Sequence, residues 1–351
     1  GGRQSLAASA GTISLGIAAS RILGFVRDLL IAKIFGTGAQ AQAFVVAFRL
    51  PNLFRDLVAE GAMTTAVVPV LSATRATKSP QEFWRLAQAL SLQVTIVVGV
   101  LGVAGMVAAP WLVRLIAPGF ADDPEKFALT VHLTRIVFPF VILIGWWAFF
   151  CGLLNSLHHF AMPALGSAVL NVFMIAGCVW LVPRLEPGIV GLAWAVMAGG
   201  VVQLIMQLPA AARLGFRWGW VWHHPGSRQI MRLLGPRLVG AAVYQISVLF
   251  NTILASFAAL VGAGAVAALY FANRLVQLPL ALFATASAQA SLPVLSEHAA
   301  RQERETFRAT LVSVLRMVVC ESLPAAVGLY VLAGPIVQIC FERGAFDAAA
   351  T

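Results

Sequence analysis

Charged residues are scarce in this chain. Asp, Glu, Lys and Arg together make up 11% of its 351 residues, whereas hydrophobic residues make up 60%. Soluble globular domains usually carry about 25% charged residues. The imbalance excludes an ordinary soluble domain and predicts an all-α protein whose chain crosses a membrane several times.

Cysteine is also scarce, and sequence signatures of catalysis are missing. The four cysteines lie singly in or beside apolar stretches, without the paired spacing of a zinc or redox site, so we expect them to be packing residues; they are Cys151, Cys178, Cys320 and Cys340. There is no Ser-His-Asp order, P-loop or dinucleotide fingerprint. We therefore expect no enzyme activity, cofactor or metal site.

Two adjacent histidine pairs, His158-His159 and His223-His224, do not change this expectation. Neighbouring side chains on a helix point about 100° apart, which makes them poor joint metal ligands. The pairs are more typical of loop surfaces.

The net charge of +10 does not indicate nucleic-acid binding. Such surfaces need clustered, solvent-facing Lys and Arg, often with stacking aromatics, and here the aromatics are mostly Phe and Trp within apolar runs. Cytoplasmic loops of membrane proteins are rich in Lys and Arg, which explains the excess better.

A membrane span needs about 20 predominantly apolar residues, and this rule gives about nine transmembrane helices. Their predicted ranges are 7–36, 40–73, 83–116, 127–155, 160–182, 188–213, 229–261, 264–297 and 305–340. Pro51 and Pro279 lie well inside the second and eighth, where proline favours a kink.

Positive charge alternates between the predicted connections. Arginines gather after the second, sixth and eighth helices, around residues 75–85, 213–232 and 301–308, while the opposite connections are uncharged or carry acids such as Asp122 and Asp123. By the positive-inside rule the N-terminus is cytoplasmic. We expect a multi-pass membrane protein.

An internal repeat divides the chain. Residues 47–50 (Ala-Phe-Arg-Leu) match 272–275 (Ala-Asn-Arg-Leu), and Pro-Val-Leu-Ser recurs at 69–72 and 293–296. Six spans separate the copies, so they share one orientation, as in transporters built from two like lobes. The predicted domains are an N-terminal lobe at 1–222 and a partial C-terminal lobe at 223–351, so we expect the chain to be a fragment.

Five arginines lie inside these apolar helices: Arg21 and Arg27 in the first, Arg49 and Arg55 in the second, and Arg274 in the eighth. A charge near the bilayer centre costs roughly 2.5 to 3.5 kcal/mol on insertion scales, so such residues face a wet cavity or a partner. The polar residues expected to support them in a cavity are Ser20, Asp28, Asp56, Glu60 and Asn273.

Internal ion pairs are one interpretation of these charges, through Arg27–Asp28 and through Arg49–Asp56 or Arg55–Glu60. The three nearby acids leave at least two of the five arginines to seek another partner. Because the planar guanidinium matches phosphate oxygens, often bidentately, a lipid-linked pyrophosphate would fit.

Several segments resemble one transporter family closely. Residues 19–28, 47–55 and 59–62 are similar to the MurJ (MviN) family of lipid II flippases, and the similarity extends through 117–120 and 270–275 to 341–346. The family belongs to the superfamily of multidrug, oligosaccharide-lipid and polysaccharide (MOP) exporters.

The resemblance implies a two-lobe fold of fourteen transmembrane helices around a cationic cavity, of which five would be missing here. It implies flipping of the undecaprenyl-pyrophosphate-linked peptidoglycan precursor, lipid II, from the cytoplasmic to the periplasmic leaflet by alternating access. Arg21, Arg27, Arg55 and Arg274 would bind the pyrophosphate, with Asp28 orienting them. The implied partners are lipid II, membrane lipids and, as candidates, cell-wall synthesis proteins.

The sequence departs from the family at two acids, because Gln42 and Asn273 stand where relatives usually carry Asp. The coupling energy therefore stays open between membrane potential, Na+ and H+. Two other functions also stay open: export of another polyprenyl-pyrophosphate-linked oligosaccharide, and a non-transporting membrane scaffold.

Overall fold

The chain folds as a bundle of helices. The computed structural model describes residues 2–57, 63–159 and 161–351, and every regular element in these ranges is helical. The all-α prediction is therefore confirmed. The α-helices are α1 (Gly2–Phe35), α2 (Ala39–Phe54), α3 (Met63–Thr77), α4 (Pro80–Val107), α5 (Ala109–Ile116), α6 (Pro124–Val137), α7 (Phe140–Ser156), α8 (Ala161–Ala176), α9 (Ile189–Ile205), α10 (Leu208–Arg213), α11 (Pro225–Ser256), α12 (Ala258–Val261), α13 (Ala265–Pro279), α14 (Ala286–Ala300), α15 (Arg304–Val331) and α16 (Ala333–Phe341).

Each of the nine predicted ranges is helical over most of its described length, although several are interrupted. Within the described residues, five stretches are long and apolar enough to cross a membrane, and a pair of α11 segments bent by 44° would make a sixth. The five are Pro80–Val107, Pro124–Ser156, Leu165–Arg184, Ile189–Arg213 and Arg304–Val331. The number of nine membrane spans stays a prediction.

The two prolines expected to disturb helices precede irregular helical turns. Pro51 lies within α2, and the chain turns π-helical at residues 55–57. Pro279 ends α13, and the π-helical segment η5 (Leu280–Thr285) joins it to α14. A proline removes one backbone N–H and its ring clashes with the preceding turn, which loosens the regular hydrogen-bond ladder. The first disturbance carries Arg55 and Asp56 of the site described below, and the second directly follows the helix that carries Arg274.

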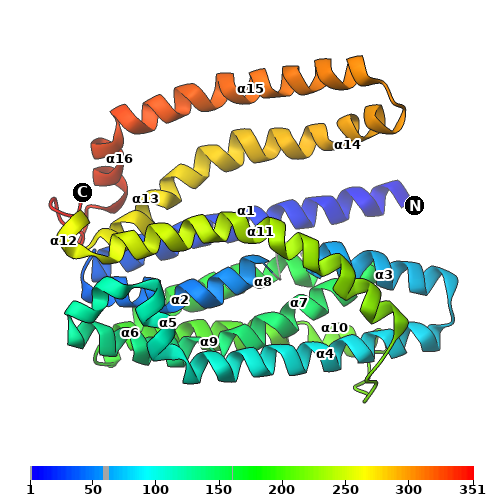
Figure 1. The fold of residues 1–351 in the computed structure, drawn as a ribbon, viewed down its shortest axis with the longest axis horizontal. Coiled ribbons are helices and arrows are strands. Elements are labelled where there is room, and N and C mark those ends of the chain that lie inside the picture. Colours follow the sequence, from blue (N-terminus) through cyan, green and yellow to red (C-terminus); the bar gives the residue numbers. More distant parts are fainter. Residues whose placement is uncertain (1, 58–62, 160) are drawn as a thin grey trace.

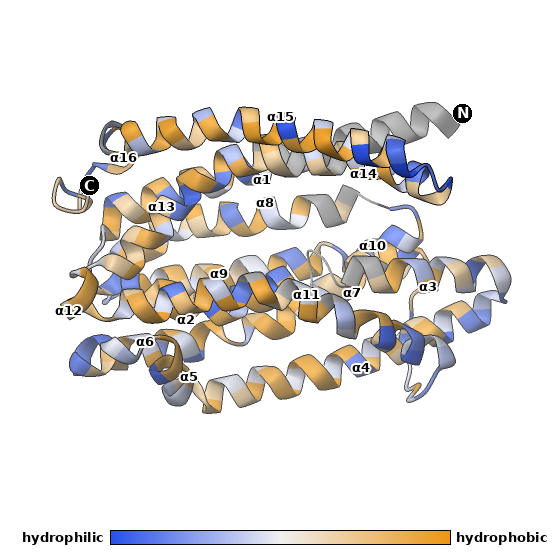
Figure 2. Cartoon of the chain, turned by 45° about the horizontal axis from the view of Figure 1, so that its top comes forward, coloured by the Kyte–Doolittle hydropathy of each residue, from blue (hydrophilic) through white to orange (hydrophobic). Residues whose placement is uncertain are grey.

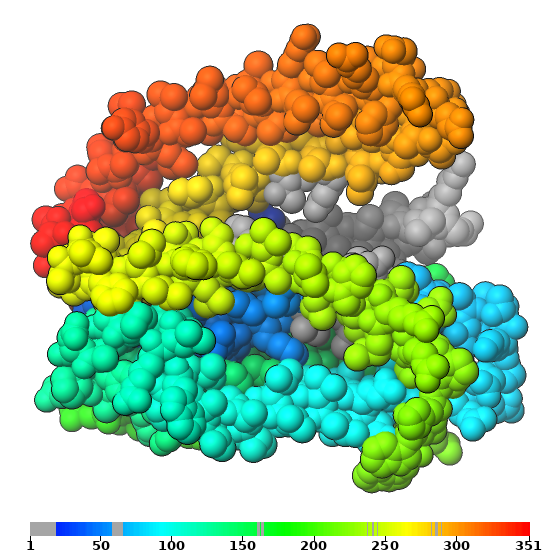
Figure 3. Space-filling model, viewed as in Figure 1, coloured from blue at the N-terminus to red at the C-terminus, as the bar shows by residue number. Residues whose placement is uncertain are grey.

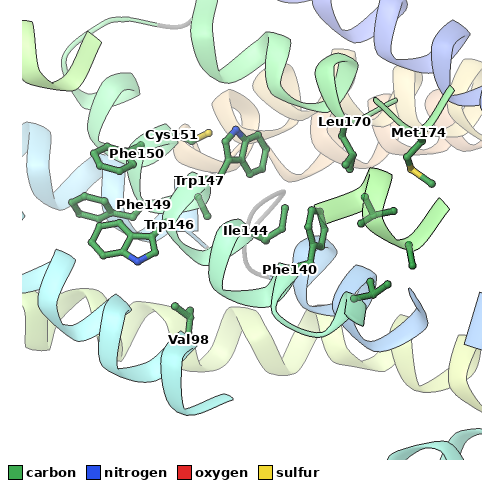
Figure 4. Close-up of a cluster of buried hydrophobic side chains, with 14 of the residues drawn as sticks. Val98, Phe140, Ile144, Trp146, Trp147, Phe149, Phe150, Cys151, Leu170 and Met174 are labelled. Atoms are coloured by element: carbon green, nitrogen blue, oxygen red, sulfur yellow. The ribbon is translucent and has the colours of Figure 1, made fainter. Parts of the chain in front are cut away.

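The core of the N-terminal part surrounds α7. This helix packs against α3, α4 and α9, and most of its residues are buried on every side. Figure 4 shows Phe140, Ile144, Trp146, Phe149 and Phe150 projecting from it into the cluster. A helix that is apolar all round belongs at the centre of a bundle. α7 is therefore the central helix of the N-terminal part.

The helices α13 to α15 form a second layer that meets the rest of the chain at one end only (Figure 1). The layers converge at α12, α16 and the C-terminus and separate toward the turn between α14 and α15. In the space-filling view of Figure 3, α14 and α15 stand apart from α11 toward this turn. No residue of α15 is buried, and Figure 2 shows that many of its residues are hydrophobic. The molecule is thus closed at one end and open at the other.

Candidate functional site: a cationic cavity

A cavity of about 500 Å³ lies between the two predicted lobes. Its walls come from α1, α2 and α8 on one side and from α11, α13 and η5 on the other. All of the predicted site residues within the described part of the chain line it, namely Ser20, Arg21, Arg27, Asp28, Arg49, Arg55, Asp56, Asn273 and Arg274. Glu60 lies outside the described residues. Arginines from helices that are far apart in the sequence therefore line the same cavity.

The charges of this cavity do not balance. Among the described residues its lining contains five arginines and two carboxylates, Asp28 and Asp56, so three positive charges are in excess in this part of the lining. A protein wall in a membrane screens charge less than water does, which strengthens the attraction for an anion. The arrangement is suited to binding a multiply charged anionic group.

Asp28 is the centre of a buried network. Its side chain is 1% exposed and accepts hydrogen bonds from Arg27 Nε and Nη2 (2.9 and 2.8 Å) and from the Tyr270 hydroxyl (3.0 Å). Arg274 Nε lies 2.9 Å from its other oxygen, in an ion pair, and Arg274 Nη2 donates to the Tyr270 hydroxyl (3.2 Å). One carboxylate thus holds two arginines from helices α1 and α13. The predicted Arg27–Asp28 pair is confirmed.

Arg27 is also tied to α8. Its Nη1 donates to Asn171 Oδ1 over 2.7 Å, and the Asn171 amide donates to the Ser20 carbonyl over 3.0 Å. Because α1 and α8 pack along each other, these bonds fix the guanidinium between them. Arg27 is therefore held in place before any ligand binds.

A second group surrounds Asp56. Arg55 Nη2 lies 3.3 Å from one oxygen of Asp56, while Asn52 Nδ2 and Gln245 Nε2 donate to the other over 3.2 and 3.4 Å. Gln245 belongs to α11, so this carboxylate also joins the two predicted lobes. The predicted Arg55–Glu60 pair involves a residue outside the described part of the chain.

Arg21 differs from the other four arginines. Its side chain is exposed and makes no hydrogen bond or ion pair with any described residue. Arg274 is partly exposed, at 33% of its side chain. These two guanidinium groups can meet a ligand in the cavity without first leaving a buried position.

Tyr270 and Asn171 are the main contributors that the sequence analysis did not include in the site. Both are neutral, and polar neutral residues in membrane helices often serve helix packing alone. Tyr270 had one available signal, because it stands four residues before Arg274 and so shares its helix face.

Gln42, one of the two residues in place of a family acid, lies away from the cavity. Its Oε1 accepts a hydrogen bond from Lys126 Nζ (2.9 Å), and its Nε2 donates to the Thr37 carbonyl (3.0 Å). Lys126 also lies 3.8 Å from the centre of the Phe120 ring, a cation–π contact. Gln42 therefore connects α2 to α6 near the closed end.

The cavity ends where the lobes touch. Gly119 N donates to Ser256 Oγ (3.1 Å), and Ala345 N donates to the Lys33 carbonyl (2.8 Å). Phe341 packs against Phe271 and Phe25. These contacts bring backbone and aromatic groups of both predicted lobes together at the end formed by the acidic connections.

Within the described ranges, no cluster of His, Cys, Asp and Glu could hold a metal ion. Cys151 and Cys178 are buried, as expected of packing residues, whereas Cys320 is exposed and Cys340 is half-buried. Cys340 packs against the main core cluster, so the packing prediction fits these three and not the exposed Cys320.

Comparison with known proteins agrees with this architecture. A family model described as lipid II flippase MurJ matches residues 31–351. The lipid II flippase MurJ of Burkholderia cenocepacia is 35% identical over 335 residues, which are 94% of this chain and 64% of that protein. A protein of Vibrio cholerae described as a probable lipid II flippase MurJ is 39% identical, over 93% of this chain and 63% of its own length. The chain thus spans somewhat less than two thirds of these curated relatives.

Solved structures are similar over nearly the whole chain. One described as lipid II flippase MurJ in an inward closed conformation matches with a TM-score of 0.81 and 25% identity, covering 96% of this chain and 69% of that one. An inward-facing multidrug transporter of the MATE family, in the MOP superfamily, matches with a TM-score of 0.72 and 14% identity, covering 94% and 74%. The second likeness shows the MOP fold alone. The chain is a multi-pass membrane protein that belongs to the MurJ family of lipid II flippases.

Proposed function

We propose that this chain binds lipid II and moves it from the cytoplasmic to the periplasmic leaflet of the bacterial inner membrane by alternating access. The observation that carries the proposal is the excess of three positive charges among the described lining residues of one cavity, which lies between the two predicted lobes. Lipid II carries a pyrophosphate, which is the kind of compact anion that several guanidinium groups bind well. No covalent step is needed, so the protein acts as a transporter and not as an enzyme.

The pyrophosphate would be bound by Arg21, Arg27, Arg55 and Arg274. Arg21 is exposed and Arg274 is partly exposed, while Arg27 is held by Asp28 and Asn171. An entering phosphate oxygen can take over part of the role of Asp28, because both are anionic acceptors of the same fork-shaped donor. Binding would then exchange a contact between lobes for a contact with the cargo.

Alternating access needs two bodies and a contact that can open. The predicted lobes, 1–222 and 223–351, supply the bodies, and the contacts of Gly119 with Ser256 and of Lys33 with Ala345 supply the closed gate. The open end carries the arginine-rich connections, so the positive-inside rule places it and the N-terminus in the cytoplasm. The structure would thus represent the state that receives lipid II from inside.

Transport against a gradient also requires an energy source, which we assign to membrane potential, Na+ or H+. Membrane lipids and cell-wall synthesis proteins are the further partners of this proposal. Within this scheme Gln42 and Asn273 place neutral amides where an acid would add a proton-binding group. Direct proton coupling through these two positions is accordingly disfavoured.

Binding competition tests the proposed substrate. The purified gene product containing this chain should bind lipid II more tightly than undecaprenyl phosphate, which has one phosphate fewer. Arg274→Ala should weaken lipid II binding about 10- to 100-fold, the loss of a charge-assisted hydrogen bond. Arg304→Ala is the matched control, because Arg304 is exposed and lies outside the cavity lining.

Three outcomes would contradict the proposal in different ways. Tighter binding of another polyprenyl-pyrophosphate-linked oligosaccharide would favour the second exporter function. Binding of no polyprenyl-linked ligand by a folded protein would favour a scaffold. Equal losses of lipid II binding in Arg274→Ala and Arg304→Ala would show that the cavity is not the binding site.

A further inference from the structure

The connection between α10 and α11, residues 214–224, presents three tryptophans to the outside. Trp218, Trp220 and Trp222 are 63%, 83% and 61% exposed, whereas Gly219 and Val221 between them are half-buried. Alternate residues of an irregular, non-helical segment thus face outward together. We call residues 214–224 the tryptophan strap. None of the residues in it lines the cavity.

The strap is fixed to the first turns of α4. The Arg217 carbonyl accepts a hydrogen bond from Gln88 Nε2 (3.0 Å), and a Cβ on Gly219 would collide with the Gln88 side chain. At its far end His224 is 8% exposed, with its Nε2 3.1 Å from Glu82 Oε2. The expectation of a loop-surface histidine was therefore wrong for His224, because it closes this attachment.

Aromatic packing holds the near end of the strap. Phe216 is 7% exposed and packs against Trp84, Phe149 and Phe150. Trp218 leans on Phe216 over 5.4 Å between ring centres. The exposure of Trp220 and Trp222 is therefore a property of an anchored segment and not of a loose loop.

The strap lies where α4 passes from polar to lipid-facing. Glu82 and Arg85 form an exposed ion pair in the first turns, and the exposed apolar run of the same helix begins at Ile96. Gln88, which carries the strap, is about 12 Å along the helix from Pro80 at 1.5 Å per residue. This is the level at which a membrane interface would cross a helix that spans the bilayer.

The remaining strongly exposed tryptophans among the described residues lie toward the opposite end. Trp111 is in α5, just beyond the end of α4, and Trp180 and Trp194 flank the connection between α8 and α9. From Gln88 to the end of α4 at Val107 the helix rises about 29 Å, close to the thickness of a bilayer's hydrocarbon core. Exposed tryptophans at two levels this far apart match the aromatic belts of membrane proteins.

The two levels differ in charge. Exposed arginines surround the strap, namely Arg213, Arg217, Arg228 and Arg232, whereas the opposite end exposes the acids Asp122, Asp123, Glu125 and Glu186 alongside basic residues that include Arg114 and Arg184. Basic residues beside a membrane attract anionic lipids, and the attraction falls off within about 10 Å at ordinary salt. The strap therefore combines interfacial aromatics with a rim of exposed arginines, while the opposite level mixes acids with basic residues.

We propose that the tryptophan strap inserts its indole rings into the headgroup region of the arginine-rich leaflet and binds anionic phospholipids there. Each indole has an apolar body and one N–H donor, so it fits the boundary between acyl chains and headgroups. The arginines bind the lipid phosphates. The strap would thus anchor the start of α11 in the membrane surface, whatever cargo the cavity carries.

Tryptophan quenching by brominated lipids tests this placement. The full gene product is reconstituted into vesicles of phosphatidylglycerol or of phosphatidylcholine, with bromines near either the headgroup end or the methyl end of the acyl chains. The fluorescence of the strap tryptophans is obtained as the difference between the native protein and the double variant Trp220→Leu/Trp222→Leu. Trp111→Leu combined with Trp194→Leu is the matched pair from the other level.

We expect the strap tryptophans to be quenched more by bromines near the headgroups than by deep ones. Quenching by phosphatidylglycerol should exceed that by phosphatidylcholine several-fold, and Arg228→Gln combined with Arg232→Gln should remove this preference. The pair at the other level should show no preference between the lipids.

Three results would overturn the inference. Quenching only by a water-soluble quencher would place the strap in water. Protection from both kinds of quencher would mean that a protein segment covers it. Equal quenching by both lipids would show that the strap does not bind anionic headgroups in preference to neutral ones.

Discussion

At the scale of single residues, the site depends on one carboxylate. Asp28 is surrounded by Arg27, Arg274 and the Tyr270 hydroxyl, all within 3.0 Å of its oxygens. Two guanidinium groups this close repel each other, and the negative charge between them offsets that repulsion. Asp28 therefore stabilises the cavity, whereas the arginines around it provide the charge that attracts a ligand.

Replacing Asp28 with Asn should destabilise the fold strongly. Removing one partner of a buried ion pair typically costs about 3–5 kcal/mol, because the other charge is left uncompensated. Tyr270→Phe should cost only about 1 kcal/mol, since it removes neutral hydrogen-bonding capacity. Thermal unfolding of both variants in detergent measures the difference, and an Asp28→Asn protein as stable as Tyr270→Phe would show that the network is not stabilising.

The residue scale also shows what a sequence can reveal. Arg21, Arg27 and Arg274 could be recognised because a charge in an apolar run has few explanations. Tyr270 and Asn171 could not, because their roles depend on which helix faces them. The same holds for His224, whose burial follows from the position of Glu82 on another helix.

At the scale of elements, close approach of helices depends on glycine. Gly105 of α4 is buried, and a Cβ there would collide with the ring of Phe138, between α6 and α7. Gly99 of the same helix has open space around it. The two positions form a matched pair for testing the packing of α4 on the core.

Gly105→Ala should destabilise the protein by about 1–3 kcal/mol, the usual cost of overpacking. Gly99→Ala should be neutral or stabilising by up to about 1 kcal/mol, because alanine is the better helix former. Unfolding midpoints of both variants in the same detergent provide the comparison. Equal midpoints would mean that α4 does not approach α6 and α7 as closely as described.

The boundaries of elements were less predictable than their presence. Apolar length alone located the nine helical ranges, but it missed the interruption at Ala108, whose one local signal is Pro110 in the first turn of α5. The π-helical turn after Pro279 was foreshadowed by the proline, although only as a kink. The local sequence predicts where a helix is disturbed, and packing decides whether the disturbance is a kink, a break or a π-helical turn.

At the scale of the whole molecule, our proposal makes this structure one of the two states of alternating access, the one that is open toward the cytoplasm. Its closed end depends on small residues, since a Cβ on Gly119 would collide with the backbone of Ser256 and Phe257. Enlarging this residue should therefore weaken the contact between the lobes. Neither Gly119 nor Ser256 lines the cavity, so the arginines of the cavity should stay in place.

Gly119→Ala should shift the population toward a state open at this end. Spin labels on Asp122→Cys and Ala259→Cys, both at exposed positions, would report the change as a longer distance in a protein whose native cysteines are replaced. Gly99→Ala serves as the control. An unchanged distance distribution in Gly119→Ala would contradict the assignment of this contact as a gate.

The central claim is that lipid II crosses the membrane through the cationic cavity. The most direct measurement is the exposure of lipid II on the outer leaflet of cells depleted of their own flippase and expressing the gene product containing this chain. We predict that the native protein and Arg304→Ala restore exposure, while Arg27→Ala and Arg274→Ala, inserted to the same level, do not. Normal exposure with both cavity variants would contradict the claim.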